Sequence, residues 1–490
     1  MCPRCSLSSL FDPPGFTLKS GSFGENTTVM RASPYSVRPV RERTHSFNTF
    51  AGLDTGPETI AWNVGTHHHR WCRSLDAGAL SGRVIVTPPG STRCMQRSRE
   101  DLYRTDDQLR LPLAAAMRDG GARLGQNGRV SGAAISLFSG AGGLDLGVER
   151  AGFHTVAAVE WDEDAADSME KNGSTYFPEL REVLRANLYP LAAGGDDGVT
   201  TKDILRAGGL SSRNRPELLV GGPPCVAFSK SGFWLDWKRD GIDPAASLLQ
   251  AYTRVLAEAK PRFFILENVY ALTFNNKASR PAFERLLREI DAAGYQFQWR
   301  VLNAADYGVS QARPRLFIVG SRKSDRLPEF PEPTHHGQWE RRQTEGGPLP
   351  HFTTGQALAG VVAPPEPEEV VRGRWGHLLP EIPPGENYLH YTAERGHPDP
   401  IFEWRSRYWS FLLKLDPDRP SPTIQAQPGP NVGPFHWENR RLRVPELRRL
   451  FTFPDDYAFV GRRGSVQAQI GNCVPPLLAQ QVAAAIAAKA

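Results

Sequence analysis

The chain has 490 residues, of which 40% are hydrophobic and 23% charged, a balance that is ordinary for a globular protein of two or three domains. No run of about 18 apolar residues stands out, so no membrane span is expected. The N-terminal segment MCPRCSLSSLF lacks the apolar core of a secretory signal, which favours a cytoplasmic protein. Six cysteines are too sparse in this length for a disulfide scaffold.

The net charge of +5 is unevenly distributed along the chain. Residues 1–130 hold 17 Lys and Arg against 11 Asp and Glu, whereas residues 131–490 hold 41 against 42. The part of the chain with globular character is therefore close to neutral. Binding to a polyanion would rely on local clusters of basic residues rather than on overall charge.

Residues 1–130 show neither helical nor strand periodicity. One segment, 102–119, could form a helix, but Pro112 interrupts it. Six residues with metal-ligating side chains also occur here: Cys2, Cys5, His67, His68, His69 and Cys72. Only the first two have a metal-site spacing, so no metal site is predicted. We interpret this segment as a disordered extension or as the result of a start codon assigned too far upstream.

From Ala133 the pattern changes to apolar runs that alternate with helical segments. Six of these runs read as strands: AAISLF, HTVAAVE, ELLVG, RFFILENV, YQFQWRVLNAADYG and RPRLFIVGSR. Strands that alternate with helices are typical of an α/β fold with a largely parallel sheet covered on both faces. We place this domain at residues 131–325.

The rest of the chain divides into an irregular part and a helical part. Residues 326–436 are rich in proline and polar residues, and predict a smaller domain of loops and short strands. Residues 437–490 return to helical character, with Leu477, Leu478, Val482 and Ile486 at helical spacing, and should pack on the first domain. The basic segment ENRRLRVPELRR (438–449) could bind phosphate or could serve packing.

A glycine-rich turn follows the first expected strand. Gly140, Gly142 and Gly143 would let the backbone approach a ligand closely, although their spacing is not the dinucleotide fingerprint G-x-G-x-x-G. The next strand ends at Glu160, where such folds place an acid for ribose hydroxyls. Trp161 follows and could cover an adenine ring. The glycines alone fit a tight turn equally well, and Glu160 favours a nucleotide-like ligand.

Further reactive side chains follow other strands, at the edge of the sheet where α/β folds hold ligands. Cys225 comes directly after Pro223 and Pro224, whose rings restrict the backbone. Glu267 lies at the end of the neighbouring strand, and Arg313 and Arg315 alternate and should share one strand face. Each has an ordinary structural explanation, but a nucleophile, an acid and two bases at one edge indicate an active site.

Seven segments carry a resemblance to a known family: FSGAGG, VEWD, GGPPCVAFSKSG, ENV, VLNAADYGVSQARPR, RPSPTI and IGNCVPP. In this order they resemble the DNA (cytosine-5) methyltransferases, and the resemblance runs from about Ala134 to the C-terminus. It implies a Rossmann-like S-adenosylmethionine-dependent methyltransferase domain with a mixed, mostly parallel sheet. It also implies a smaller, irregular target-recognition domain, which we place at residues 326–436.

The resemblance implies a covalent mechanism on cytosine. Cys225 would add to carbon 6, so that carbon 5 can accept a methyl group. Glu267 would hold or protonate ring nitrogen 3, and Arg315 would contact the base, while Arg313 supports Glu267. The target base must leave the duplex to be reached, and the segment 226–244 would close over it.

The same resemblance implies the ligands and their contacts. S-adenosylmethionine would be held by Phe138, Ser139, Gly140, Gly142, Gly143, Glu160, Trp161, Asp203, Pro223 and Asn472. Ser229, Gln311 and Thr423 would contact DNA. The recognition region also offers Arg372, Arg374, Arg405, Arg407 and Tyr408, each of which could read a base, contact phosphate or be solvated.

The expected activity is therefore methylation of carbon 5 of cytosine in a short duplex DNA sequence. The expected partners are double-stranded DNA and a cognate restriction endonuclease, and we expect a monomer with no membrane association. Two alternatives remain: a tRNA cytosine-5 methyltransferase, and a catalytically silent DNA-binding protein of the same fold.

Overall fold

The computed structural model describes residues 132–192, 198–224, 244–277, 279–337, 347–405 and 408–489. The N-terminal extension, with its candidate helix and metal ligands, lies outside these residues. Cys225, Ser229, Arg407 and nearly all of the segment 226–244 lie outside them as well.

A seven-stranded sheet in the order β3-β2-β1-β4-β5-β8-β6 forms the centre of the described fold. Strands β1 to β5 pair in parallel, and only β8 runs antiparallel to its two neighbours, β5 and β6. The predicted α/β class with a mixed, mostly parallel sheet is confirmed. The strands are β1 (Gly132–Leu137), β2 (Phe153–Glu160), β3 (Glu182–Arg185), β4 (Leu218–Gly221), β5 (Phe263–Val269), β6 (Tyr295–Asn303) and β8 (Pro314–Arg322).

All six expected strands are present, and β3 is an addition. Its four residues EVLR bury a single side chain, so they carry little strand signal. The fifth expected strand, 295–308, ends earlier than predicted, because η5 (Ala304–Tyr307) follows Asn303 as a single 3₁₀ turn. The Asn303 side chain accepts from the backbone N–H of Ala305 and so caps this turn.

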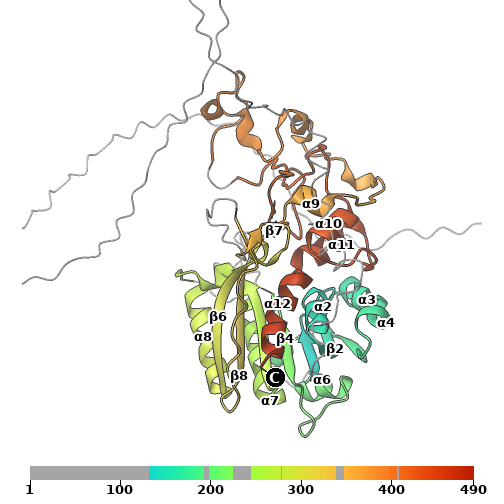
Figure 1. Ribbon diagram of the computed structural model, residues 1–490, viewed down its shortest axis with the longest axis vertical. Coiled ribbons are helices and arrows are strands. Elements are labelled where there is room, and N and C mark those ends of the chain that lie inside the picture. The colour runs from blue at the N-terminus through green and yellow to red at the C-terminus, as the bar shows by residue number, and fades with distance from the viewer. Residues whose placement is uncertain are drawn as a thin grey trace, which may run out of the picture. The chain divides into compact units, whose positions relative to one another are not determined.

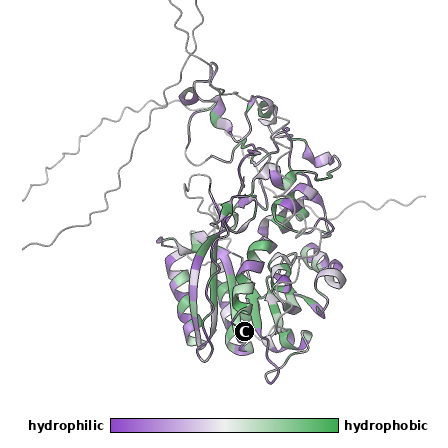
Figure 2. Ribbon diagram, in the orientation of Figure 1, coloured by the Kyte–Doolittle hydropathy of each residue, from purple (hydrophilic) through white to green (hydrophobic). Residues whose placement is uncertain are grey.

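Helices cover both faces of the sheet because side chains along a strand alternate in direction. In β5, Phe264 and Leu266 pack with the helices of one face, and Phe263 and Ile265 with those of the other. Figure 2 shows the hydrophobic residues concentrated on the central strands. The first face carries α6 (Thr201–Ala207), α7 (Pro244–Ala259) and α8 (Ser279–Ala292), and the second α2 (Gly143–Arg150) and α12 (Pro476–Ala487).

The C-terminal helix packs against the helices of the sheet domain. In Figure 1, α12 (red) lies beside α2 (cyan), although the two are far apart in sequence. A Cβ atom on Gly147 of α2 would lie 2.4 Å from Ala479 Cβ, so only glycine allows the two helices to approach this closely. Arg463–Ala487 is long and apolar enough for a membrane span by length and composition, but 61% of its apolar window is buried in this packing.

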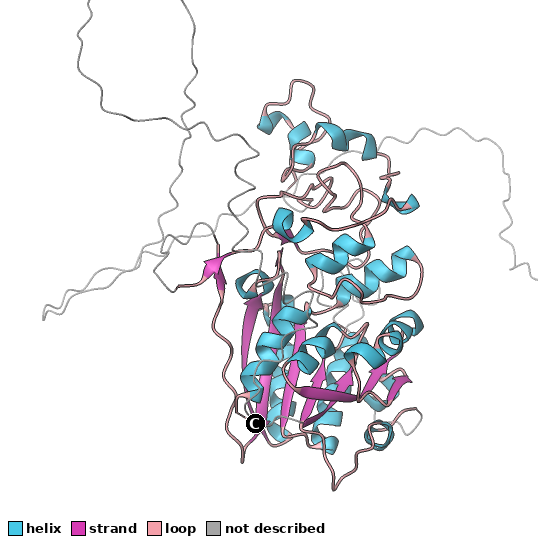
Figure 3. Cartoon of the chain, turned by 45° about the vertical axis from the view of Figure 1, so that its right-hand side comes forward, coloured by secondary structure: helices cyan, strands magenta, loops and turns pink. Residues whose placement is uncertain are grey.

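Two further helices and a mostly irregular segment complete the fold. Helices α10 (Val444–Leu450) and α11 (Arg463–Asn472) share an apolar cluster with α3 (Glu163–Lys171). The segment coloured orange in Figure 1 appears in Figure 3 mainly as loops and short helical turns. It has its own apolar cluster, which contains Leu379, Tyr388 and Phe435.

The border of this irregular segment is less sharp than the predicted 326–436. Leu415 and Ile424 belong to the apolar cluster of α10 and α11 rather than to that of Leu379. The remaining elements are α4 (Gly173–Tyr176), α5 (Tyr189–Ala192), η4 (Tyr270–Thr273), β7 (Gln311–Ala312), β9 (His335–His336), β10 (Leu349–Pro350), α9 (Thr354–Leu358), η6 (Pro367–Glu369), η7 (Gly376–Glu381), η8 (Tyr388–Tyr391), η9 (Ala393–Arg395) and β11 (Ser421–Pro422).

Candidate active site

The turn after β1 combines tight packing on one side with open space on the other. Phe138, Gly140 and Gly142 have positive φ angles of 55°, 55° and 75°. A Cβ atom on Gly142 would lie 2.9 Å from the Phe177 ring, and one on Gly143 would lie 2.6 Å from the Val474 carbonyl oxygen. A Cβ atom on Gly140 would meet nothing within 4 Å. Gly142 and Gly143 therefore serve packing, whereas Gly140 faces space that a ligand could use.

Glu160 joins this turn to the end of β2. Its carboxylate accepts the backbone N–H of Gly140 at 2.7 Å and those of Trp161 and Asp162 at 2.9 Å. Burial raises the pKa of Glu160, and these three donors act in the opposite direction. Ser139, also buried, donates its backbone N–H to Val159. Trp161, whose backbone N–H donates to this carboxylate, is 70% exposed, so an acid and an open aromatic residue are adjacent in the chain.

Two more of the residues expected to contact S-adenosylmethionine lie at helix ends. Asp203 is in the first turn of α6, where its carboxylate accepts from the backbone N–H of Thr200 and from Arg206 at 2.8 Å. It thus caps its own helix, a structural task that sequence inspection missed. Asn472 is the last residue of α11 and is exposed, between the buried Gly471 and Cys473.

Glu267 and Arg315 form a buried ion pair at the carboxyl end of β5. Arg315 Nε lies 3.2 Å from Glu267 Oε1, because Val269 of β5 pairs with Arg315 of the antiparallel strand β8. Burial raises the pKa of Glu267, and the charges of Arg315 and Arg313 oppose this shift. A Cβ atom on Gly222 would lie 3.0 Å from Glu267 Oε2, so the backbone that leads to Cys225 passes directly beside this carboxylate.

Asn268, the middle residue of the ENV segment, was not among the residues expected at the site, yet it links β5 to the segment before Cys225. Its side-chain amide donates to the carbonyl oxygen of Pro223 at 3.0 Å, and its oxygen accepts from the N–H of Val269 at 2.9 Å. Asn268 is 2% exposed and Pro223 is buried. The strand that carries Glu267 therefore holds the chain two residues before Cys225.

Arg313 does not share a strand face with Arg315, and this expectation was wrong. The segment breaks at Arg313, between β7, which pairs with β11, and β8, which pairs with β5. The Arg313 side chain, 1% exposed, donates to the carbonyl oxygens of Gly471 at 2.7 Å, Cys473 at 2.9 Å and Ile424 at 3.4 Å. It also lies over the ring of Phe451. Arg313 thus joins three distant segments, while its charge acts on Glu267 from a distance.

The expected DNA contacts occupy two different environments. Gln311 is fully buried, and its oxygen accepts from the N–H of Ile424 at 3.3 Å, so the structure places it inside the protein rather than on a DNA-facing surface. Thr423 is half-buried and donates to the carbonyl oxygen of Ala312 at 2.8 Å. Both side chains support the pairing of β7 with β11.

The comparisons with known proteins agree with this arrangement. The model of the C-5 cytosine-specific DNA methylase family matches residues 132–488. The chain belongs to this family. It is a DNA (cytosine-5) methyltransferase, and the resemblance read from its motifs is confirmed.

Relatives of this methylase include named enzymes of type II systems. The type II methyltransferase M.SacI of Streptomyces achromogenes is 45% identical over 375 residues, which cover 72% of this chain and 92% of the relative. M1.HphI of Haemophilus parahaemolyticus is 32% identical over 373 residues, or 72% of this chain and 86% of the relative. The solved S. pombe Dnmt2 methyltransferase covers 73% of this chain and 98% of its own, with 15% identity and a TM-score of 0.46.

The basic segment 438–449 serves packing in the methylase. Arg440 pairs with Glu446 at 2.8 Å, and Arg443 pairs with Glu369 at 2.5 Å. Only Val444–Leu450 of the segment is helical. The segment could have bound phosphate or served packing, and these ion pairs support packing of the irregular segment against α10.

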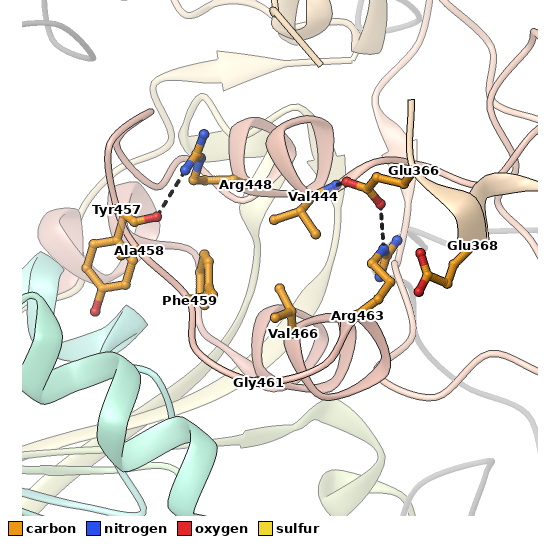
Figure 4. Close-up of a pocket in the computed structure, with 10 residues that line it drawn as sticks. All are labelled: Glu366, Glu368, Val444, Arg448, Tyr457, Ala458, Phe459, Gly461, Arg463 and Val466. Atoms are coloured by element: carbon orange, nitrogen blue, oxygen red, sulfur yellow. Dashed lines mark hydrogen bonds and ion pairs between the residues drawn. The ribbon is translucent and has the colours of Figure 1, made fainter. Parts of the chain in front are cut away.

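A cavity of about 450 Å³ between α10 and α11 is separate from the candidate active site (Figure 4). Glu366 at its wall accepts from the N–H of Val444 at 2.7 Å and from Arg463 Nε at 2.9 Å. Tyr457 is its link to the glycine-rich turn, because the hydroxyl donates to the Ala141 carbonyl oxygen at 2.7 Å. Glu366 thus joins the start of α10 to the start of α11.

Two buried acids lie behind the glycine-rich turn of the methylase. Asp145 accepts from the hydroxyl of Thr155 at 3.3 Å, and Glu149 accepts from the N–H of Thr155 at 2.7 Å and lies 3.2 Å from His154 Nδ1. Burial raises the pKa of Asp145 to about 6 and that of Glu149 to about 7. Between about pH 4 and these values the folded protein binds more protons than the unfolded chain, so stability falls as pH rises.

The free energy of unfolding of the wild type should fall as pH rises through this range, and titration of Asp145 accounts for about 2–3 kcal/mol of that fall. Replacement of Asp145 by asparagine is expected to abolish this part. Urea unfolding between pH 4 and 8 measures it: the free energy of unfolding of Asp145→Asn should change less with pH than that of the wild type. Asp167→Asn is the control, because Asp167 is an exposed acid paired with Arg185. Equal pH dependence in Asp145→Asn and the wild type would contradict the prediction.

Proposed function

We propose that the enzyme transfers a methyl group from S-adenosylmethionine to carbon 5 of a flipped cytosine in a specific short duplex DNA sequence, through a covalent adduct of Cys225 at carbon 6. One observation carries this proposal. The buried Glu267–Arg315 pair lies beside Gly222, three residues before Cys225. A buried acid and a guanidinium beside the backbone that leads to a cysteine suit a reaction in which charge develops on a pyrimidine ring.

The donor site fits a nucleoside. The carboxylate of Glu160 can accept hydrogen bonds from ribose hydroxyls, and the exposed Trp161 ring can lie against adenine. The open space at Gly140 lets the backbone approach the ligand. When bound, S-adenosylmethionine supplies an electrophilic methyl group. The proposed set also contains Phe138, Ser139, Gly142, Gly143, Pro223 and Asn472. Asp203 belongs to it as well, but its carboxylate already caps α6, so only its remaining lone pairs could accept a hydrogen bond from the ligand.

The base site assigns one task to each side chain. The thiolate of Cys225 forms a bond with carbon 6, and the electron pair of the 5,6 double bond moves toward carbon 5. Glu267 donates its proton to ring nitrogen 3, which its raised pKa favours. Arg315 contacts the base on the same side. Once carbon 5 carries the transferred methyl group, ring nitrogen 3 returns its proton to Glu267, and loss of the carbon 5 proton to a base re-forms the 5,6 double bond and expels the thiolate of Cys225.

Duplex DNA is the proposed substrate rather than tRNA. The relatives M.SacI and M1.HphI are both type II methyltransferases. The match to M.SacI covers 92% of that protein. Type II methyltransferases act beside restriction endonucleases, so a cognate endonuclease is the proposed functional partner. The carbon 5 atom is inaccessible in a stacked base pair, so the cytosine must be flipped out to reach Glu267. A catalytically silent protein would not need a buried Glu267–Arg315 pair beside Gly222, on the backbone that leads to Cys225.

Cytosine-conversion sequencing tests the function. The protein is expressed in a methylation-deficient host beside Cys225→Ala, and genomic DNA is sequenced after conversion. Protected cytosines in one short recurring sequence, absent with Cys225→Ala, are the expected result.

The other outcomes separate the alternatives. Soluble wild-type protein with no protected cytosine in DNA, but with protected cytosine in tRNA, would establish the RNA substrate. Protection that persists in Cys225→Ala would overturn the covalent mechanism. Absence of methylation in both nucleic acids, with DNA binding retained, would indicate the silent protein.

A further inference from the structure

We infer that Arg405 reads a base edge of the target DNA, and that the buried hydroxyl of Tyr388 holds Arg405 in position for this contact. The inference rests on the proposed function, because it assigns a specificity-determining residue to the same reaction. It arises from a loop of the irregular segment in which a fixed backbone carries exposed side chains.

The backbone at Arg405 is anchored on both sides by one hydroxyl group. Arg405 donates its N–H to the Tyr388 oxygen at 2.9 Å, and the Tyr388 hydroxyl donates to the Arg405 carbonyl oxygen at 2.8 Å. Tyr388 is 3% exposed and its ring packs against Phe402 and Phe411. A buried tyrosine that satisfies both backbone groups of one loop residue restricts where that residue can lie.

Neighbouring bonds extend this anchoring along the loop. The side chain of Asn387 donates to the carbonyl oxygen of Trp409 at 2.7 Å. The N–H of Phe411 donates to Tyr408 at 2.8 Å, and that of Tyr408 donates to Arg405 at 3.3 Å. Hydrogen bonds from Tyr388 in the 3₁₀ turn η8, and from Asn387 directly before it, therefore fix the described part of the loop.

The side chains of the anchored residues point away from the protein interior. The Arg405 side chain is 64% exposed, and three aromatic neighbours are also open to solvent. Trp404 is 56%, Tyr408 51% and Trp409 44% exposed. Large aromatic side chains that gather on a surface mark an interaction site. Beside a guanidinium they suit nucleic acid, since aromatic rings stack on bases and sugars.

Arg405 is less engaged within the protein than two other arginines, Arg374 and Arg441. Its ion pair with Glu403 spans 3.8 Å, and the Glu403 carboxylate is 88% exposed, so water separates them at little cost. The guanidinium of Arg374, in contrast, lies over the ring of Trp375 at 4.6 Å. Arg441 donates to the carbonyl oxygen of Pro430 and lies over Phe435. These two groups already have partners within the protein.

The chemistry of a guanidinium identifies the base. Two parallel N–H donors match the O6 and N7 acceptors of guanine in the major groove, and this is the commonest specific contact of arginine with DNA. A fixed Cα position is needed because a base contact, unlike a phosphate contact, depends on register. We therefore assign Arg405 to a guanine of the recognition sequence.

The test compares methylation of target and near-target sequences by four forms of the full-length enzyme. Wild type, Arg405→Ala, Arg405→Lys and Tyr388→Phe each methylate a random-sequence duplex DNA library, which is read by conversion sequencing. Arg405→Ala is expected to lose about 10- to 100-fold in rate on the wild-type target. It should also accept other bases at one position of that target. Lysine should restore rate but not discrimination, and Tyr388→Phe should show the same relaxed position with a smaller loss.

Arg395→Ala is the matched control, because Arg395 is an exposed arginine of the same segment. It should keep the rate and the sequence of the wild type. The inference would be overturned if the wild type is active and Arg405→Ala still discriminates fully at every position of the target. This holds both for an unchanged rate and for a rate that is uniformly reduced with a weaker salt dependence. The latter would indicate a phosphate contact. Absence of methylation by the wild type would instead overturn the proposed function and this inference with it.

Discussion

Replacement of Glu267 by glutamine is expected to slow DNA methylation by about 10²- to 10⁴-fold while the fold is retained. Glutamine has the same shape and can donate a hydrogen bond to ring nitrogen 3, but it cannot give up a proton. Its neutral amide also avoids the cost of burying a carboxylate, which raises the pKa of Glu267 in the wild type. Arg315 keeps its bond to the Pro314 carbonyl oxygen at 2.8 Å.

Single-turnover methylation of a duplex that contains the target measures this effect. Glu284→Gln is the control, since Glu284 forms an exposed pair with Arg280 on α8. The pH profile adds a second readout. A raised pKa keeps Glu267 protonated to higher pH than an ordinary glutamate, so a rate that depends on its proton falls as pH rises through that pKa. Glu267→Gln should lack this limb, and a variant with wild-type rate and pH profile would refute the assignment.

Replacement of Arg313 by methionine is expected to lower the free energy of unfolding by about 3–5 kcal/mol. Methionine fills similar volume over Phe451, but the carbonyl oxygens of Gly471, Cys473 and Ile424 lose their buried donor. Each buried group left without a partner costs about 1–3 kcal/mol. The loss also removes a positive charge that opposes the raised pKa of Glu267.

Urea unfolding at pH 7 tests this prediction beside Arg300→Met. Arg300 also lies over an aromatic ring, Phe330, but is exposed, so its replacement should change the free energy of unfolding by less than about 1 kcal/mol. Similar values for the two variants would show that the bonds of Arg313 to Gly471, Cys473 and Ile424 add little. A stable Arg313→Met enzyme with a normal rate would also exclude a positioning role.

The order of strands, glycines and acids could be read from the sequence because each depends on local pattern. The apolar run of β5 ends at Glu267, and that of β2 ends at Glu160, so parallel pairing had to bring both to one sheet edge. Asn268 could also have been predicted as a site residue, since the sequence analysis identified the ENV segment that contains it. Tyr457 carried no local signal, because its contact with Ala141 joins residues far apart in sequence.

The sequence by itself determined the α/β class, the family, and the side chains placed at the carboxyl edge of the sheet, because hydrophobic periodicity and short motifs are local properties. Only the tertiary structure showed that residues of the same type in one motif have different partners. Arg313 and Arg315 alternate in one motif, yet a break between β7 and β8 directs one to backbone carbonyls and the other to Glu267. The partner of a long polar side chain is set by which distant segments packing brings within hydrogen-bond reach, and spacing along the chain does not encode this.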